Sequence, residues 1–166
     1  SGRRYQQLPD GALVLRSLTS WPAQLERRLS ARGAACADRR AAALVAGRFE
    51  FLGQAESLPD PIDWHLTSSP QRPHLWHFLL HYQEYLLDLV AAARATGDAR
   101  YQERAWELIT GWIAGNRPDD PRVFASAWHP YTISRRLPAW MYVWTAHPPA
   151  DTLRDAVLTS IWQQAR

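Results

Sequence analysis

Residues 74–114 read HLWHFLLHYQEYLLDLVAAARATGDARYQERAWELITGWIA and carry the clearest pattern in the 166-residue chain. Apolar residues recur at helical spacing over 74–95, on more than one side, which predicts a largely buried helix. Thr96-Gly97-Asp98 then predicts a helix end followed by an N-cap. A second helix is expected over 99–114. Because the connection between them is so short, the two helices must run antiparallel and form an αα-hairpin.

Shorter elements are expected before this hairpin. The patterns predict helices at Gln24–Arg32 and Arg39–Ala46, with irregular chain over the first twenty residues. Arg48–Gly53 alternates apolar and polar residues and then meets a glycine, which predicts a short extended piece entering a turn. Four prolines exclude a long helix between residues 54 and 73.

Two further helices are expected towards the C-terminus. The first covers about Ile133–Thr145 and contains Pro138, which should either kink the helix or mark its first turn. Asp151 is expected to cap the last helix, whose apolar pattern is still running at Arg166. No stretch predicts a parallel sheet. The expected fold class is therefore all-α, with antiparallel helical hairpins stacked around a common centre.

Composition restricts the class of protein. The net charge of +3 is too small to indicate nucleic-acid binding, and no apolar stretch is long enough to span a membrane. All 19 basic residues are Arg, which can hold a carboxylate or sulfate through two parallel hydrogen bonds. Such a protein would suit an acidic polymer, although a solvated surface is the simpler interpretation for most of these arginines. The single cysteine, Cys36, excludes an internal disulfide framework and is expected to be a small buried apolar residue.

The chain is rich in tryptophan, with nine such residues. Indole rings can stack on the flat faces of sugars, but large helical proteins also use tryptophan to fill the core. About five of the nine are expected to be core residues, since tryptophan is highly buried on average.

His77, His81, Glu84 and Asp88 are spaced so that they form one polar line along the first helix of the hairpin. Three interpretations remain open: a polar stripe beside a cleft, a wall that binds substrate, or a metal site. The metal reading is the weakest, because Phe78 stands where the zinc-protease motif has a glutamate. No metal or other cofactor is expected.

Trp128, His129, Tyr131 and Arg136 lie where a loop enters a helix, a position that often presents side chains to a ligand. Trp128 could stack on a sugar ring while Arg136 holds a carboxylate or sulfate. Alternatively, Trp128 wedges the loop onto the core and Arg136 pairs with a neighbouring acid. Tyr82 and Tyr131 could carry protons, although a helical tyrosine more often has a packing role.

Two motifs resemble the heparinase II/III-like polysaccharide lyases. Trp76–Leu86, WHFLLHYQEYL, is similar to a front motif of that family with an aromatic residue, a His-Tyr pair, an acid and Tyr-Leu. Trp128–Arg136, WHPYTISRR, resembles the family signature Trp-x-Pro-Tyr-x-Ile-Ser-x-Arg. The similarity covers residues 48–166, which are expected to form the family's N-terminal helical domain after an irregular segment with short helices over 1–47. Leu79 and Pro138 depart from the family pattern.

The resemblance implies part of an incomplete α/α toroid from a lyase that cleaves uronic-acid-containing acidic polysaccharide by β-elimination. Its catalytic asparagine is expected beyond Arg166, with more helices and a β-sandwich in the remainder of the parent protein. Residues 1–166 alone are therefore expected to be inactive. The expected partner is an acidic polysaccharide, either heparan-type or a bacterial exopolysaccharide, and the expected location is periplasmic or secreted. The candidate substrate-binding residues are Trp76, His77, His81, Tyr82, Trp128, His129, Tyr131 and Arg136.

Two other functions remain open from the sequence. The chain could be a non-catalytic carbohydrate-binding or assembly module that keeps the same helical scaffold and uses the same residues. It could also be a generic helical scaffold that binds protein partners through exposed aromatic faces.

Overall fold

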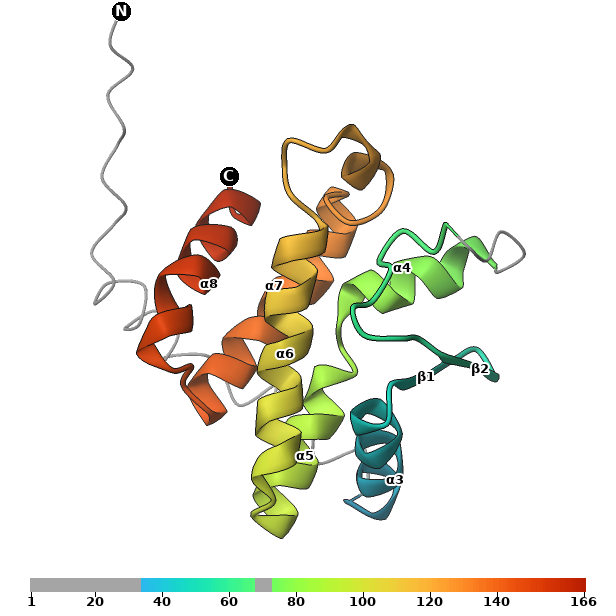
Figure 1. Ribbon diagram of the computed structural model, residues 1–166, viewed down its shortest axis with the longest axis vertical. Coiled ribbons are helices and arrows are strands. Elements are labelled where there is room, and N and C mark those ends of the chain that lie inside the picture. Colours follow the sequence, from blue (N-terminus) through green and yellow to red (C-terminus); the bar gives the residue numbers. More distant parts are fainter. Residues whose placement is uncertain (1–33, 68–72) are drawn as a thin grey trace, which may run out of the picture.

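The computed structural model describes residues 34–67 and 73–166, which are mostly helical (Figure 1). The predicted helix Gln24–Arg32 and the first twenty residues lie outside this part. The helical fold class is confirmed, with one small two-stranded sheet in addition. In chain order the elements are α3 (Ala34–Val45), β1 (Arg48–Phe51), β2 (Gln54–Ser57), α4 (His74–Tyr82), α5 (Leu86–Thr96), α6 (Ala99–Gly115), the 3-10 helix η1 (Pro121–Ala125), α7 (Pro130–Ala146) and α8 (Asp151–Gln164).

The predicted αα-hairpin is formed by α5 and α6, which pack side by side (Figure 1). Gly97 ends α5 in the left-handed conformation, with φ of 71°, where a glycine carries no steric penalty. The Asp98 side chain then accepts a hydrogen bond from the Arg100 backbone N–H at 3.0 Å and so caps α6. Local sequence signals therefore determine this connection.

The predicted continuous helix over 74–95 is wrong, because the chain breaks at Gln83. This residue is fully buried and left-handed, with φ of 52° and ψ of 23°, a conformation that costs an ordinary residue about 1–2 kcal/mol. Its side-chain amide accepts from the Trp140 indole N–H at 2.5 Å and donates to the Leu108 carbonyl at 3.3 Å. Partners on α6 and α7 thus compensate for the break between α4 and α5.

The extended piece at Arg48–Gly53 is confirmed as β1, which pairs antiparallel with β2 in the register Arg48 opposite Ser57. The strand β2 falls where the sequence predicts only a loop. Trp76 of α4 stabilises it, since its indole N–H donates to the Gln54 carbonyl at 3.2 Å. A contact 22 residues away in sequence therefore adds to the local pairing of β1 with β2.

Two helix boundaries also differ from the prediction. Helix α3 begins at Ala34, five residues before the predicted start at Arg39. Helix α7 begins at Pro130, not Ile133, because proline suits the first turn, where its missing N–H has no intrahelical acceptor. Pro138 therefore lies inside α7 and does not mark its first turn.

Tryptophans form much of the core and also connect its elements. Among the described residues, six tryptophans are buried and two, Trp128 and Trp162, are partly exposed. The expectation of about five core tryptophans is therefore close to the structure. Most of the buried indoles also donate a hydrogen bond, as buried indole N–H groups usually do.

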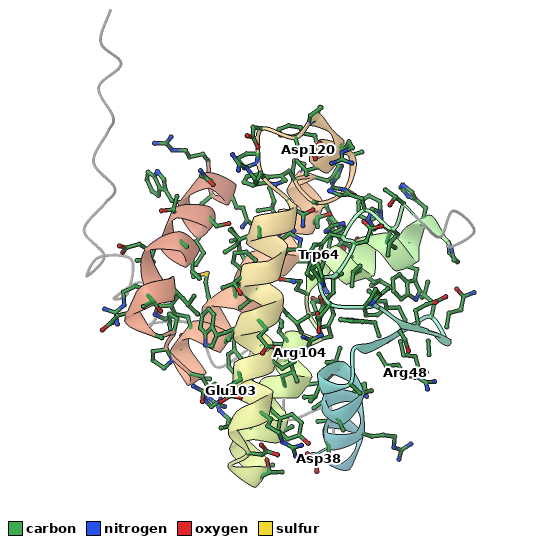
Figure 2. All side chains as sticks on the ribbon, in the orientation of Figure 1. Asp38, Arg48, Trp64, Glu103, Arg104 and Asp120 are labelled. Carbon is green, nitrogen blue, oxygen red and sulfur yellow. The ribbon has the colours of Figure 1, made fainter. Side chains whose placement is uncertain are left out.

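Trp64 attaches the loop before α4 to helix α6, beside which Figure 2 labels it. Its indole N–H donates to the Gly111 carbonyl at 3.0 Å. A Cβ added at Gly115 would lie 2.4 Å from Trp64 Cδ1, whereas one at Gly111 would lie 4.0 Å from the same ring. The ring is 3% exposed and cannot move aside easily. The absence of a side chain at Gly115 is therefore what lets the Trp64 loop approach α6.

We expect Gly115→Ala to lower the free energy of unfolding by about 1–3 kcal/mol, because the new methyl group overlaps the Trp64 ring. Gly111→Ala is the matched control on the same helix. It meets the ring at ordinary contact distance and should be neutral or stabilising by up to about 1 kcal/mol through helix propensity. Denaturant unfolding would measure both variants, and equal stabilities for the two would contradict this account of Gly115.

Candidate substrate-binding surface

Arg136 lies in the core, where its guanidinium caps the broken end of α4. It is 0% exposed and donates to the carbonyls of His81 at 3.1 Å and Ala127 at 2.8 Å. Two further hydrogen bonds reach the Gln164 side-chain oxygen of α8 at 2.9 and 2.7 Å. A cation is favourable at this position, since the last carbonyls of a helix carry partial negative charge.

The environment of Arg136 fits neither interpretation made from the sequence. Its guanidinium stacks on the Trp112 ring at 3.7 Å, and its hydrogen bonds go to carbonyls and an amide, not to an acid. Burial lowers its pKa to about 9. The sequence placed Arg136 in a groove that binds carboxylate or sulfate, but the structure places it inside the protein, where it holds three helices together.

His81 is also fully buried and is held by a chain of hydrogen bonds. The Trp112 indole N–H donates to its Nδ1 at 3.0 Å, so the proton of the neutral ring must be on Nε2. That nitrogen lies 2.9 Å from Nε2 of His77. His77 Nε2 in turn lies 2.8 Å from the Trp64 carbonyl oxygen.

The Trp64 carbonyl oxygen can only accept, so its 2.8 Å contact with His77 Nε2 is a hydrogen bond in which His77 donates. His81 also reaches the Trp64 carbonyl, and one oxygen with two lone pairs can accept from both rings. Burial lowers the pKa of His77, and burial together with the neighbouring His77 and Arg136 lowers the pKa of His81 well below its usual value. The pair is neutral and is held by the Trp64 carbonyl and the Trp112 indole.

The two tryptophans of the predicted set, Trp76 and Trp128, pack against other elements of the protein. Trp128 is partly exposed, donates to the Asn116 carbonyl at 2.8 Å and lies 6.3 Å from the Trp112 ring. It therefore fixes the loop before α7 onto the core, as the alternative interpretation expects. Trp76 is 0% exposed and packs on Phe51 of β1 at 4.9 Å between ring centroids.

Four rings from α4 and the start of α7 form a cluster at the protein surface, called here the aromatic surface: Phe78, Tyr82, His129 and Tyr131. Phe78 lies 6.2 Å from Tyr82 and 6.1 Å from His129, and Tyr82 lies 5.8 Å from Tyr131. His129 is exposed, Tyr131 is 56% exposed, and Tyr82 is nearly buried at 9%. Burial raises the pKa of Tyr82. Three residues of the predicted set, Tyr82, His129 and Tyr131, therefore lie together here, and only the exposed His129 and Tyr131 offer most of their side chain to a ligand.

His129 also caps α7. Its Nδ1 accepts the Tyr131 backbone N–H at 3.3 Å, so the neutral ring carries its proton on Nε2. On an exposed side chain, this second nitrogen can donate to an external acceptor. Beside the aromatic surface, Arg135 and Glu84 form an ion pair at 2.6 Å that joins α7 to the α4–α5 connection.

Sequence reasoning missed several residues that build the site. Gln83 and Gln164 carry no local signal, because their partners lie 57 and 28 residues away. Phe78 is not among the residues predicted for the site, although its spacing from Tyr82 on one helix face could have placed it on the aromatic surface. Among the described residues, no group of three or more His, Cys, Asp or Glu side chains is arranged to hold a metal ion. None of the described helices has the length and hydropathy needed to cross a membrane.

We expect the stability of the folded chain to fall as the pH drops below 6.5, because the unfolded state protonates His81 there and the folded state resists it. The loss should approach about 1.4 kcal/mol per pH unit for this one fully buried histidine. Denaturant unfolding between pH 7.5 and 5.5 would measure it. His81→Gln should reduce the slope without abolishing it, since His77 and His147 also have lowered pKa values. Equal slopes in the two proteins would exclude His81 as the cause.

Arg136→Lys should cost about 2–4 kcal/mol of stability, because an ammonium cannot reproduce the forked hydrogen bonds or the stacking on Trp112. Arg135→Lys is the neighbouring control. Its ion pair with Glu84 is partly exposed, and the change should cost less than about 1 kcal/mol. Thermal or denaturant unfolding would compare the two, and a tolerated Arg136→Lys would overturn the capping role.

The comparisons with known proteins agree with this architecture. The structure is similar to the crystal structure of heparan sulfate lyase HepC from Pedobacter heparinus, with a TM-score of 0.68 at 17% sequence identity. The similarity covers 78% of this chain and 21% of that lyase, so the chain spans about a fifth of its length. Among curated protein sequences, none matches the chain. The family described as Heparinase II/III N-terminus matches residues 22–165, nearly the whole chain. The chain therefore belongs to the heparinase II/III family and corresponds to the N-terminal region of that family.

Proposed function

We propose that this chain is the front part of a polysaccharide lyase that cleaves uronic-acid-containing acidic polysaccharide by β-elimination, and that it supplies scaffold and substrate-groove residues. The observation that carries the proposal is the family match over residues 22–165, supported by the fold similarity to a heparan sulfate lyase. In this proposal, the α5–α6 hairpin and the helices around it are part of an α/α toroid that further helices of the parent protein complete. The polymer substrate suggests a periplasmic or secreted location.

The aromatic surface is the part of the chain best suited to contact the polymer. Sugar rings present flat C–H faces that pack on aromatic rings, and Tyr131 and Phe78 offer such rings at the surface. His129 adds a nitrogen that can donate to a sugar hydroxyl or carboxylate. The buried members of the predicted set act behind this surface. Arg136 and His81 fix the end of α4, and Trp128 fixes the start of α7.

β-Elimination requires neutralisation of the uronate carboxylate, a base for the C5 proton and an acid for the leaving oxygen. His77 and His81 are already held by hydrogen bonds to Trp64 and Trp112, so they are unsuited to proton transfer with a substrate. The exposed His129 and Tyr131 are the groups of the predicted set that can approach a sugar. The remaining catalytic groups are proposed to come from the C-terminal helices and β-sandwich of the parent protein.

The parent gene product, incubated with uronic-acid polysaccharides, is expected to release products with the ultraviolet absorbance of an unsaturated uronate. The 166-residue chain alone should release none, because the proposed catalytic groups lie outside it. If the parent protein binds these polymers but forms no unsaturated product from any of them, the chain belongs to a non-catalytic carbohydrate-binding module instead.

In a separate binding experiment with the parent protein, Tyr131→Ala should weaken oligosaccharide binding by about five- to tenfold, the loss expected for one stacking contact. Phe124→Ala is the matched control, since Phe124 is also a large exposed aromatic side chain, at 55%, but lies on η1, outside the aromatic surface. Isothermal titration calorimetry would measure both. Equal effects of the two substitutions on the affinity would exclude the aromatic surface as part of the proposed substrate groove.

A further inference from the structure

A cavity of about 650 Å³ lies between α3, β1 and the connection from α4 to α5. This volume is within the range of small-molecule binding sites, which are commonly about 300–1,000 Å³. Its lining combines charged side chains with aromatic rings: Arg39, Arg40, Arg48, Phe51, Tyr82 and Asp88. Of the candidate substrate-binding residues taken from the sequence, only Tyr82 lines this cavity, together with Glu84 and Asp88 of the predicted polar line.

The acids of the cavity are largely matched by arginines. Arg40 donates to both carboxylate oxygens of Asp88, at 2.9 and 3.0 Å, and so fixes α3 against α5. Glu84 is held by Arg135 at 2.6 Å. The third acid in the lining is Glu50, which is exposed on β1.

Arg39 and Arg48 are the remaining cations of the lining, and both are exposed. Within residues 34–67 and 73–166, neither makes an ion pair or a hydrogen bond through its side chain. Arg48, labelled in Figure 2, extends from the start of β1, and Arg39 lies on α3. After the matched pairs are set aside, the two guanidinium groups of Arg39 and Arg48 and the single carboxylate of Glu50 remain in the lining, so the cavity favours an anion.

The walls of the cavity connect it to the aromatic surface. Phe51, Leu79 and Tyr82 supply its apolar lining. Tyr82 also contacts Tyr131 at 5.8 Å between ring centroids, so one ring belongs to both features. An extended ligand could therefore place one ring on the aromatic surface and its neighbour in the cavity.

We infer that this cavity binds the carboxylate or sulfate group of an acidic sugar residue through Arg39 and Arg48, next to a sugar held on the aromatic surface. The two guanidinium groups provide forked hydrogen bonds that match the planar carboxylate and the oxygens of sulfate. The statement that the anionic group belongs to a sugar rests on the proposed function. The preference for an anion rests on the cavity itself.

The test is binding of the 166-residue chain to three oligosaccharides of equal length, measured by calorimetry at fixed ionic strength. One carries sulfate and carboxylate groups (heparin-derived), one carries carboxylates only (oligogalacturonate), and one is neutral (maltooligosaccharide). The double variant Arg39→Ala/Arg48→Ala should bind the acidic ligands at least tenfold more weakly than the unaltered chain. Loss for both acidic ligands indicates a carboxylate site, and loss for the heparin-derived ligand alone indicates a sulfate site.

The matched control is Arg100→Ala/Arg117→Ala. It removes the same charge, and each of these exposed arginines pairs with an aspartate two positions away, outside the cavity. It should change the affinity by less than twofold. Equal losses in the two double variants would show general charge attraction and overturn the inference, as would unchanged binding in Arg39→Ala/Arg48→Ala.

A second variant, Arg39→Lys/Arg48→Lys, keeps the charge but not the forked geometry, so its affinity should be intermediate. Thermal unfolding within a few degrees of the unaltered chain would confirm that the variants fold. This outcome is separate from the proposed activity. A parent protein without lyase activity could still show arginine-dependent binding. An active lyase whose affinity for acidic ligands is unchanged by these substitutions would overturn only the inference about the cavity.

Discussion

The C-terminal end of α4 is the point on which the rest of the structure depends. The chain leaves the helix at Gln83, and the carbonyls of the last turn lose their intrahelical donors. The buried guanidinium of Arg136 donates to the His81 carbonyl, and the Tyr85 hydroxyl donates to the Leu80 carbonyl. Because an unpaired buried polar group is costly, this junction fixes α4 relative to α7 and α8.

The same junction gives the candidate site its two layers. Inside, Trp112 holds His81 while Arg136 stacks on the Trp112 ring and donates to the carbonyls and the amide around it, so the polar groups of this cluster are paired. Outside, the shared boundary of α4 and α7 carries the aromatic surface. The buried layer determines where the exposed rings lie, since the residues that end α4 and begin α7 are the ones fixed in the core. Substrate contact and structural support are therefore divided between neighbouring residues of the same two motifs.

That division explains how far the sequence could predict the site. The two motifs contain residues that do lie together, since Arg136 donates to the His81 carbonyl and Tyr131 contacts Tyr82. Their residue types could not show which members face solvent. Arginine is among the residues least often buried, so Arg136 was expected at a surface. Its burial depends on the Gln164 side chain, the His81 and Ala127 carbonyls and the Trp112 ring, all brought to it by folding.

The sequence by itself determined the elements whose signals are local. Gly97 and Asp98 define the turn between α5 and α6, and the helical spacing of the apolar residues defines the face that α6 buries. Only the tertiary structure decided the break at Gln83 and the interior position of Arg136. The physical reason is the same in both cases. In each case the local sequence disfavours a feature, a left-handed backbone at Gln83 and a buried guanidinium at Arg136. Hydrogen-bond partners from distant segments stabilise both features, and no local pattern encodes those partners.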